Sequence, residues 1–438
     1  MNIGLALYNI IVPAAAALAR ATAPFNPKIA EGLAGRARWQ EHWRQNVASL
    51  ARNVPLIWFH VSSVGEYLQA RPVIELLESR HGGNIDIALT FFSPSGMNYF
   101  TTHDRAKKSD MIRFTDYLPI DTRGNARSCL DTLLPDMIVY VKFDLWPNLI
   151  FEASRRRIPQ ILVSGTLAPS SRRLAFPVRR FYGNLYSSLT AIAAISDEDA
   201  GRFRLHARDT LEIVTAGDTR FDSVCGSIDS STVALPRALT ADARRFVIAG
   251  STWPRDEAVV IPGFAEVHRR VPGAALILVP HEPTDVRIGE IARSLERMQL
   301  PFVRLSALAD RETFDEPVVV ADGLGYLAEL YRAGFIAYVG GSFTTGVHNV
   351  MEPAVLGLPV LFGPRIKNSH EACRLVELDA ASIVRTVDDF VRETEPMLRN
   401  AGLRTRRGAA GMEFIRNSCG ATAHCVDLIE KHLKGGNR

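Results

Sequence analysis

The largest group of residues that could perform chemistry lies between Tyr338 and Gly363. A β-prone run stops at Gly340-Gly341, a polar turn follows, and an apolar run from about Asn349 ends before a second β-prone run at residues 360–362. This order predicts a strand, a glycine turn, a helix and a strand. Such a turn lets backbone N–H groups approach an anion, which the positive end of a helix dipole favours. The stretch therefore predicts a nucleotide or sugar-phosphate site, with glycines needed only for packing as the alternative.

Polar side chains within this stretch strengthen the prediction of a binding site. They are His348, Asn349 and Glu352. Because two anions repel each other, Glu352 is assigned to sugar hydroxyls and not to the phosphate.

A second group begins at His60 and runs through a small-residue turn into the start of a predicted helix. It contains Ser63, Gly65 and Glu66. A carboxylate in a partly desolvated cleft can take a proton from an attacking hydroxyl, so Glu66 is a candidate general base. A glutamate that only stabilises the helix dipole is an equally good interpretation from spacing alone. His60 is typical of a strand-end histidine with satisfied hydrogen bonds.

A third group, residues 142–148, also follows a β-prone run. Asp144 would form a carboxylate pair with Glu66 if both strands are central, and such a pair can tune a pKa or orient a substrate. Alternatively, Asp144 pairs with Lys142 or caps the next helix. Arginine forks suit phosphates, although a solvated surface is an equal alternative for the nearby basic residues. These are Arg155, Arg156, Arg157, Arg172, Arg173, Arg179 and Arg180, flanked by Phe176 and Phe181.

Two more loops follow predicted strands in the second half of the chain. They carry Ser251 and Thr252 in one case, and His281 and Glu282 in the other. Ligands bind at the carboxyl ends of parallel strands, so these loops would border the same site as the glycine turn. The chain has no GxxxxGK[ST], GxSxG or HExxH motif. This argues against ATPase, hydrolase and zinc-protease classes.

The elements that position these groups alternate regularly from Pro55 onward. Strands are predicted at 56–61, 85–90, 137–141, 160–163, 246–249, 275–279, 318–321, 335–339 and 360–362, with helices at 66–77, 122–134, 148–156, 256–270, 286–298 and 412–433. The alternation predicts an α/β protein with parallel sheets. The pattern weakens over 217–245, where the linker between two Rossmann-like halves is expected. A cleft is expected between the halves, and the last helix is expected to pack on the first.

Composition agrees with a globular chain of two domains. The 438 residues are 47% hydrophobic and 22% charged, with a net charge of +4. Residues 1–215 hold 25 Lys and Arg against 19 Asp and Glu, so the first half is the better candidate for an anionic partner. The five cysteines have no CxxC spacing, which predicts reduced thiols and no zinc site.

The first 19 residues are almost wholly apolar and contain Pro13. No basic residue precedes them, which disfavours a cleaved secretory signal. The segment is expected to contact a membrane, by spanning it or by lying in its interface, with a packing helix as the alternative. Arg20, Lys28, Arg36 and Arg38 follow, and by the positive-inside tendency they predict a cytoplasmic body.

Taken together, the motifs resemble the 3-deoxy-D-manno-octulosonic acid (Kdo) transferases of lipopolysaccharide synthesis, which are glycosyltransferases of the GT-B architecture. The resemblance covers nearly the whole chain. It rests on the apolar N-terminus, KIAEGLAGR at 28–36, HVSSVGE at 60–66, DLWPNL at 144–149, GDTRFD at 217–222 and the GGS…HNVMEP…G-PVLFGP block that begins at Gly340.

The resemblance implies a membrane-associated helix (1–20), an acceptor-binding domain (21–225), a donor-binding domain (226–411) and a C-terminal helix on the first domain (412–438). Glu66 and Asp144 would be catalytic, with Glu66 as the base in an inverting transfer of Kdo from CMP-Kdo to a lipid A precursor. The acceptor would meet Ser63, Gly65 and Lys142. The donor would meet Ser251, Thr252, His281, Glu282, Gly340, Gly341, Ser342, His348, Asn349 and Glu352.

The same resemblance implies no metal, no cofactor, no nucleic-acid partner and a place on the cytoplasmic face of the inner membrane. The chain departs from the family at two points. Many members have Glu where Asp144 stands, and many have Arg-His-Pro where this chain has His281-Glu282-Pro283. The alternatives are another GT-B nucleotide-sugar transferase or epimerase, or a non-catalytic, membrane-associated nucleotide-binding protein.

Overall fold

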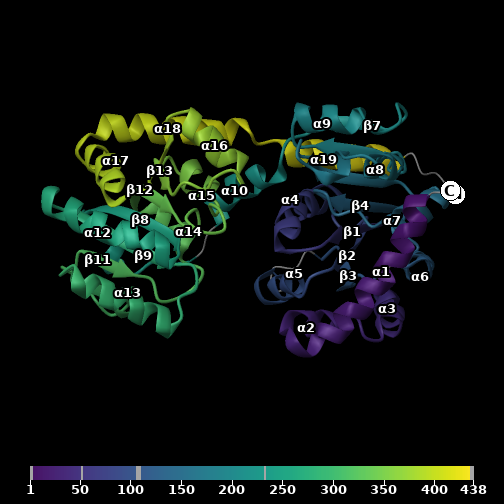
Figure 1. Ribbon diagram of the computed structural model, residues 1–438, viewed down its shortest axis with the longest axis horizontal. Coiled ribbons are helices and arrows are strands. Elements are labelled where there is room, and N and C mark those ends of the chain that lie inside the picture. Colours follow the sequence, from purple (N-terminus) through teal and green to yellow (C-terminus); the bar gives the residue numbers. More distant parts are fainter. Residues whose placement is uncertain (1–2, 51–52, 105–109, 231–232, 435–438) are drawn as a thin grey trace. The chain divides into compact units, whose positions relative to one another are not determined.

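The protein divides into two compact units, which are described separately. The computed structural model describes residues 3–50, 53–104, 110–230 and 233–434. The first unit is Met1–Ser223 with Cys419–Arg438, and the second is Val224–Ser418. Each unit contains one seven-stranded sheet (Figure 1).

The first unit has the strand order β3-β2-β1-β4-β5-β6-β7, and all pairings are parallel. Its strands are β1 (Leu56–Val61), β2 (Asp86–Phe91), β3 (Ile112–Tyr117), β4 (Met137–Val141), β5 (Gln160–Gly165), β6 (Ala191–Ala194) and β7 (Glu212–Thr215). Its helices are α1 (Ile3–Thr22), α2 (Pro27–Gly35), α3 (Trp39–Asn46), α4 (Val64–His81), α5 (Pro94–Tyr99), α6 (Arg123–Leu133), α7 (Pro147–Arg155), α8 (Val178–Tyr186), α9 (Asp197–Arg204), α10 (Thr219–Ser230, which crosses the unit boundary) and α19 (Ala421–Lys434).

The second unit has the strand order β10-β11-β9-β8-β12-β13-β14, again all parallel. Its strands are β8 (Arg245–Thr252), β9 (Ala274–Pro280), β10 (Phe302–Arg304), β11 (Val318–Val320), β12 (Gly334–Val339), β13 (Val360–Phe362) and β14 (Ala381–Ile383). Its helices are α11 (Arg237–Thr240), α12 (Pro254–Arg270), α13 (Asp285–Arg297), α14 (Leu327–Arg332), α15 (Met351–Val355), α16 (His370–Glu377), α17 (Val387–Arg399) and α18 (Ala401–Asn417).

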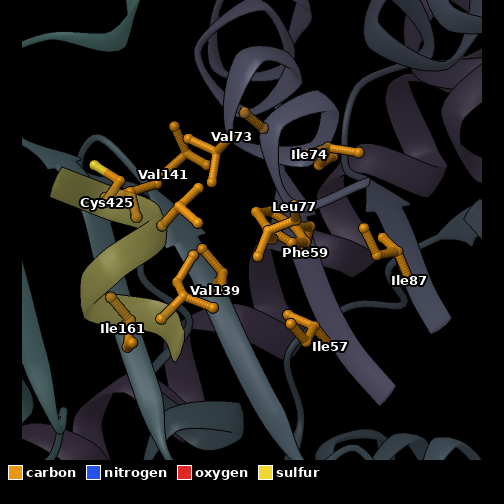
Figure 2. Close-up of a cluster of buried hydrophobic side chains, with 14 of the residues drawn as sticks. Ile57, Phe59, Val73, Ile74, Leu77, Ile87, Val139, Val141, Ile161 and Cys425 are labelled. Atoms are coloured by element: carbon orange, nitrogen blue, oxygen red, sulfur yellow. The ribbon is translucent and has the colours of Figure 1, made fainter. Parts of the chain in front are cut away.

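The central strands are apolar on both faces because helices cover both sides of each sheet. In the first unit, α4 and α19 lie side by side over one face and bury Leu77 and Cys425 against Phe59 and Val139 (Figure 2). The last helix of the chain therefore completes the core of the first unit. Since core side chains contact several neighbours each, residues distant in sequence hold this face together.

The predicted α/β class with two Rossmann-like sheets is confirmed. The strands β1, β4 and β13 have the bounds that the sequence predicted. The prediction omitted β3, β6, β7, β10 and β14. Of these, β3, β7, β10 and β14 are the edge strands of the two sheets, and β10 and β14 have only three residues each. Such short edge segments leave little periodicity to detect.

The expected linker over 217–245 is not an irregular segment throughout, because α10 and α11 lie within it. Its residues 231–232 lie outside the described part. The expected continuous helix at 412–433 is two helices, α18 and α19. Gly420 separates the two helices with a φ of +113°, and its N–H donates to Asp222 at 2.6 Å. Asp222 also accepts from Thr422 N at 2.8 Å. This carboxylate therefore fixes the point at which α19 begins.

The order of strands creates one topological switch point in each sheet. In the first unit the chain direction across the sheet reverses between β1 and β4, and in the second unit between β8 and β12. Ligands of doubly wound folds bind outside the carboxyl ends of the strands at such points. The residues that follow β1 and β4 are therefore the candidate site residues of the first unit, and the residues that follow β8 and β12 are those of the second unit.

Candidate active site

The first cluster of the candidate site follows β1 and surrounds Glu66 in the first turn of α4. Ser63 is the N-cap of this helix, and its Oγ accepts from Gly65 N at 3.2 Å. The Ser63 hydroxyl also donates to the Glu66 carboxylate. Glu66 is only 7% exposed. The positive end of α4 and the Ser63 hydroxyl thus hold this carboxylate at the switch point of the first sheet.

The neighbouring strand β4 leads directly to Asp144, which has a more elaborate set of partners. Its Oδ2 accepts from Trp146 Nε1 at 3.2 Å and from the Ser62 hydroxyl, and it lies 3.2 Å from His60 Nε2. Burial raises the pKa of Asp144, but the interactions with His60, Ser62 and Trp146 outweigh burial, so this pKa lies below its usual range. Asp144 is thus held as an ionised carboxylate.

His60 is fully buried on β1 and links Asp144 to the interior of the sheet. Its Nδ1 lies 2.9 Å from Thr90 Oγ1 on β2, and this hydroxyl also accepts from Trp58 Nε1 at 2.8 Å. These contacts match the interpretation of His60 as a strand-end histidine with polar partners.

Lys142 follows β4 and lies near the exposed aromatic ring of Phe143. It has a positive φ of 64°, and its Nζ lies 5.1 Å from the centroid of Phe143. The guanidinium of Arg173 lies 5.2 Å from the same ring. Part of the predicted basic region therefore lies against Phe143, the residue before Asp144 in the sequence. Another part is paired with acids, since Arg155 contacts Glu152 and Arg156 contacts Asp131 and Glu152.

The glycine turn of the second unit follows β12 and differs from the expectation in one important respect. Gly340 N donates to Gly250 O at 2.9 Å, and Gly341 N donates to Asp256 Oδ2 at 3.0 Å. Ser342 is fully buried, and its Oγ accepts from Gly363 N at 2.6 Å. The N–H groups of Gly340 and Gly341 are therefore occupied within the unit and are not free to donate to an anion, while the Ser342 hydroxyl accepts a hydrogen bond that helps to shape the turn.

The glycines are required by close packing, which was the alternative interpretation. A Cβ on Gly340 would lie 2.2 Å from Ser251 O, and a Cβ on Gly341 would lie 2.4 Å from Gly346 O. Gly341 also has a φ of +96°. Helix α15 begins only at Met351, so the turn is not joined directly to a helix N-terminus.

Asp256 is a central residue of this site that the sequence analysis missed. It is 1% exposed and accepts from Gly341 N, from Trp253 N at 2.9 Å and from Tyr338 OH at 2.9 Å. Burial raises its pKa, although these hydrogen bonds oppose the shift. The sequence feature that could have identified Asp256 is its position two residues after Pro254, within the first turn of the helix that follows β8.

Three aromatic rings form a stack beside the turn. His281 lies on His348 with 4.5 Å between ring centroids, and Trp253 lies on His281 at 4.8 Å. Trp253 Nε1 also donates to His348 Nε2 at 2.9 Å. Burial, and then the neighbouring His281, lower the pKa of His348. His348 is thus held neutral with Nε2 as an acceptor. Trp253 is a second residue that the sequence analysis missed.

The remaining residues that the sequence predicted to bind the donor substrate differ in their exposure and in their hydrogen-bond partners. Asn349 Nδ2 donates to Glu352 Oε1 at 2.9 Å, and burial raises the pKa of Glu352 against this hydrogen bond. Glu282 is exposed. Thr252, in contrast, is buried and donates to Glu257 Oε1 at 2.9 Å, and Ser251 has a φ of +52°. The Thr252 hydroxyl is therefore occupied by a carboxylate of α12.

Two solved structures share the fold of the two units. A solved UDP-GlcNAc 2-epimerase from Neisseria meningitidis bound to UDP-GlcNAc superimposes with a TM-score of 0.57 at 12% identity, covering 87% of this chain and 100% of that chain. MurG from Acinetobacter baumannii superimposes with a TM-score of 0.51 at 13% identity, covering 86% and 99%. The two parallel-sheet units thus have the GT-B fold.

Sequence comparison shows similarity to one enzyme family. Residues 37–223 match the family model of 3-deoxy-D-manno-octulosonic-acid transferase (kdotransferase). The 3-deoxy-D-manno-octulosonic acid transferase of Haemophilus influenzae is 27% identical over 388 residues, covering 86% of this chain and 87% of that protein. These similarities confirm the resemblance to the Kdo transferase family, and they show that the chain is a glycosyltransferase related to these enzymes.

Proposed function

We propose that the protein transfers Kdo from CMP-Kdo to a lipid A precursor with inversion at the anomeric carbon. The observation that supports this most strongly is the placement of Glu66. It lies at the switch point of a sheet within the matched residues 37–223, in contact with Ser63 and at the start of α4. A carboxylate held in this way can accept a proton from a substrate hydroxyl.

In the proposed reaction, Glu66 takes the proton of the attacking acceptor hydroxyl. The hydroxyl oxygen forms a bond to the anomeric carbon of Kdo while the bond to the CMP phosphate oxygen breaks, and CMP leaves with the electron pair. Asp144 acts as a positioning residue for this step, because His60, Ser62 and Trp146 already hold its carboxylate. Lys142 then provides a cation for an anionic group of the acceptor.

The donor is expected to contact side chains near the glycine turn directly. His281, Asn349 and Glu352 are assigned to the donor's polar groups, with Glu282 at the exposed side. Gly340, Gly341 and Ser342 are assigned to the shape of the site. Ser251 and Thr252 support the same turn from β8.

A cation is needed for the phosphate because this chain lacks the arginine of the Arg-His-Pro motif. Arg365 is suitably placed within the second unit. Its backbone N donates to Ser342 O at 2.9 Å, and its guanidinium donates to Thr344 O at 2.5 Å. The side chain therefore lies beside the glycine turn, where a guanidinium could meet a phosphate oxygen.

The proposed place of action is the cytoplasmic face of the inner membrane. Helix α1 with the turn after it, Ile3–Phe25, is long and apolar enough by composition to span a membrane. Its exposed large side chains are Ile3, Leu7, Ile10, Ile11, Leu18 and Phe25. Such a row of apolar side chains on one helix suits contact with lipid. A lipid acceptor would then be available to the first unit.

The nucleotide that the protein binds tests this proposal against other GT-B enzymes. A ligand that binds only the folded state raises the melting temperature by mass action. CMP is expected to raise the Tm of the intact protein, and UDP at the same concentration is expected to leave it unchanged. A response to UDP and not to CMP would reject CMP-Kdo as the donor and would favour a UDP-sugar enzyme.

A further inference from the structure

A cavity of about 380 Å³ lies within the first unit, bordered by α1, α2 and the segment that follows β3. It is lined by Pro13, Ala16, Arg20, Leu33, Arg36, Ala37, Trp39, Pro119, Ile120, Thr122 and Asn125. This volume falls within the range of ~300–1,000 Å³ that is usual for small-molecule sites. None of the residues proposed above for the reaction lines it.

The walls of this cavity suit an apolar chain attached to an anion. Aliphatic and aromatic side chains form most of the lining, and no Asp or Glu is among the lining residues. Arg20 is exposed at the end of α1, and it forms no ion pair with any residue that the structure describes. An unopposed cation beside an apolar cavity attracts an anionic amphiphile.

Arg36 has a different part in the cavity, as a fixed component of its wall. Its guanidinium donates to Leu118 O at 2.9 Å and to Gly32 O at 2.5 Å, and it also donates to Phe92 O. Burial lowers its pKa to about 10. Because carbonyl groups already occupy this side chain, Arg20 remains as the cation available to a ligand.

The position of the cavity connects it to the acceptor side of the candidate site. Strand β3 ends at Tyr117, so the cavity lies at the same edge of the sheet as Glu66 and Asp144. The guanidinium of Arg36 lies 4.3 Å from the ring centroid of Phe92, which lies 4.5 Å from that of Trp146. Trp146 donates to Asp144. A continuous set of contacts therefore runs from the cavity wall to the loop that carries Asp144.

We propose that this cavity binds one acyl chain of the lipid acceptor, with Arg20 beside an anionic group of the same molecule. The inference rests on the proposed function and adds to it a subsite for the apolar part of the substrate. The contacts described above connect the cavity to the loop that carries Asp144, at the same edge of the sheet. A lipid with an acyl chain in the cavity would therefore have its head group near Asp144, which favours the acceptor over a bulk membrane lipid.

The test compares two acceptors and three variants of the intact protein in detergent. The acceptors are a tetra-acylated lipid A precursor and the same phosphorylated disaccharide after removal of its acyl chains. Ala16→Trp fills the cavity from α1, whereas Ala14→Trp places the same ring on an exposed position of α1 that does not line it. Leu33→Trp fills the cavity from the opposite wall and checks that the effect belongs to the cavity and not to α1.

The cavity-filling variants should raise KM for the acylated acceptor by roughly tenfold or more, since each buried methylene contributes about a fourfold gain in affinity. They should leave kcat and KM for the deacylated acceptor unchanged. Ala14→Trp should match the wild type on both acceptors. Equal KM values for Ala16→Trp and Ala14→Trp on the acylated acceptor would overturn the proposal, and so would an equal loss on both acceptors.

A second measurement separates the acceptor from a bulk lipid. Brominated phosphatidylglycerol in mixed micelles quenches tryptophans that its chains contact, and Trp39 lines the cavity. Quenching that disappears in Trp39→Phe, and that saturating acceptor does not relieve, would assign the cavity to bulk lipid and overturn the proposal. Relief of quenching by the acceptor would support it. Failure of the wild type to transfer Kdo to either acceptor would instead contradict the proposed function.

Discussion

Glu66 and Asp144 follow adjacent parallel strands, but they differ in the number of side chains that contact their carboxylates. Within the described part of the chain, Glu66 has one side-chain hydrogen-bond partner, the Ser63 hydroxyl, whereas Asp144 contacts His60, Ser62 and Trp146. A base must be able to change its protonation during the reaction, and a carboxylate held by three partners resists that change. The geometry therefore favours Glu66 as the base and Asp144 as the positioning residue.

Replacing Asp144 by Asn should lower stability in a way that depends on pH. Because the folded pKa of Asp144 is lowered, its contribution is present above the unfolded value of about 3.8 and is lost as pH falls through the folded pKa. Asp144→Asn should thus lower the free energy of unfolding by about 1–3 kcal/mol at pH 7, and by less at a pH below the folded pKa of Asp144. Urea unfolding at both pH values measures this, with the exposed Asp310→Asn as the control. An equal loss at both pH values would contradict the assignment.

Asp121 gives the opposite dependence on pH. Burial raises its pKa to about 6, while Tyr8 OH at 2.9 Å and the backbone N–H groups of Asn148 and Leu149 oppose this. The folded state binds the extra proton between about pH 4 and 6, so the stability from this group falls as pH rises through that window, by about 2–3 kcal/mol.

The variant Asp121→Asn cannot ionise and should remove this dependence from the free energy of unfolding measured between pH 4 and 7. Tyr8→Phe should move the window to higher pH, because it removes a hydrogen bond that stabilises the carboxylate. Unfolding curves that respond to pH identically in the wild type and in Asp121→Asn would reject the role of this carboxyl group.

At the scale of single elements, the glycine turn shows what a sequence pattern cannot separate. Gly340-Gly341 before an apolar run predicts both an anion site and a tight packing contact, and the two interpretations require the same residues. Only the hydrogen bonds decide between them. Gly341 N donates to Asp256, a residue of α12 that is distant in sequence, and no local spacing reveals this contact.

Gly341→Ala should destabilise the second unit by more than the cost of placing an alanine at a positive φ. Gly325 offers a matched control, because it has a φ of +90° but nothing within 4 Å of an added Cβ. Gly325→Ala should cost about 1–2 kcal/mol from its φ, and Gly341→Ala should cost a further ~1–3 kcal/mol from the collision with Gly346 O. Chemical unfolding of both variants measures the difference. Equal losses would show that the turn can relax around the added methyl group.

Helix α1 is the second element with a testable role. Ile10 is 69% exposed, whereas Leu5 on the same helix is 7% exposed. Ile10→Ser should weaken partition into vesicles by about tenfold, because an isoleucine side chain gains ~1.5–3 kcal/mol when it leaves water. It should change the unfolding free energy by less than ~0.5 kcal/mol.

The control Leu5→Ser should do the reverse, with lower stability and unchanged partition in flotation assays, since this side chain is already covered by the protein. If Ile10→Ser floats with the vesicles as well as the wild type does, the outer face of α1 is not the surface that contacts the membrane.

At the scale of the whole chain, the sequence predicts the architecture well because central parallel strands are short runs of apolar residues between glycine-rich or polar turns. The sequence predicts poorly the edge strands of the sheets and the return of α19 to the first unit. The half-buried strand β7 has weak periodicity, and the return of α19 to the first unit depends on Asp222, whose partners Gly420 and Thr422 lie far along the chain. The positions of Glu66, Asp144 and His281 soon after strands follow from the pattern, whereas the contacts of Asp256 and the stack of Trp253 on His281 depend on tertiary structure.

The central claim is that Glu66 supplies the base for Kdo transfer while the second unit binds the nucleotide. The most direct test incubates the wild type and Glu66→Gln with CMP-Kdo and a tetra-acylated lipid A precursor, and follows CMP release and the mass of the lipid product. The wild type should release CMP and add Kdo to the lipid, and Glu66→Gln should lose at least about 10²-fold in turnover while CMP still raises its Tm. No CMP release by the wild type with this acceptor, or undiminished transfer by Glu66→Gln, would contradict the account.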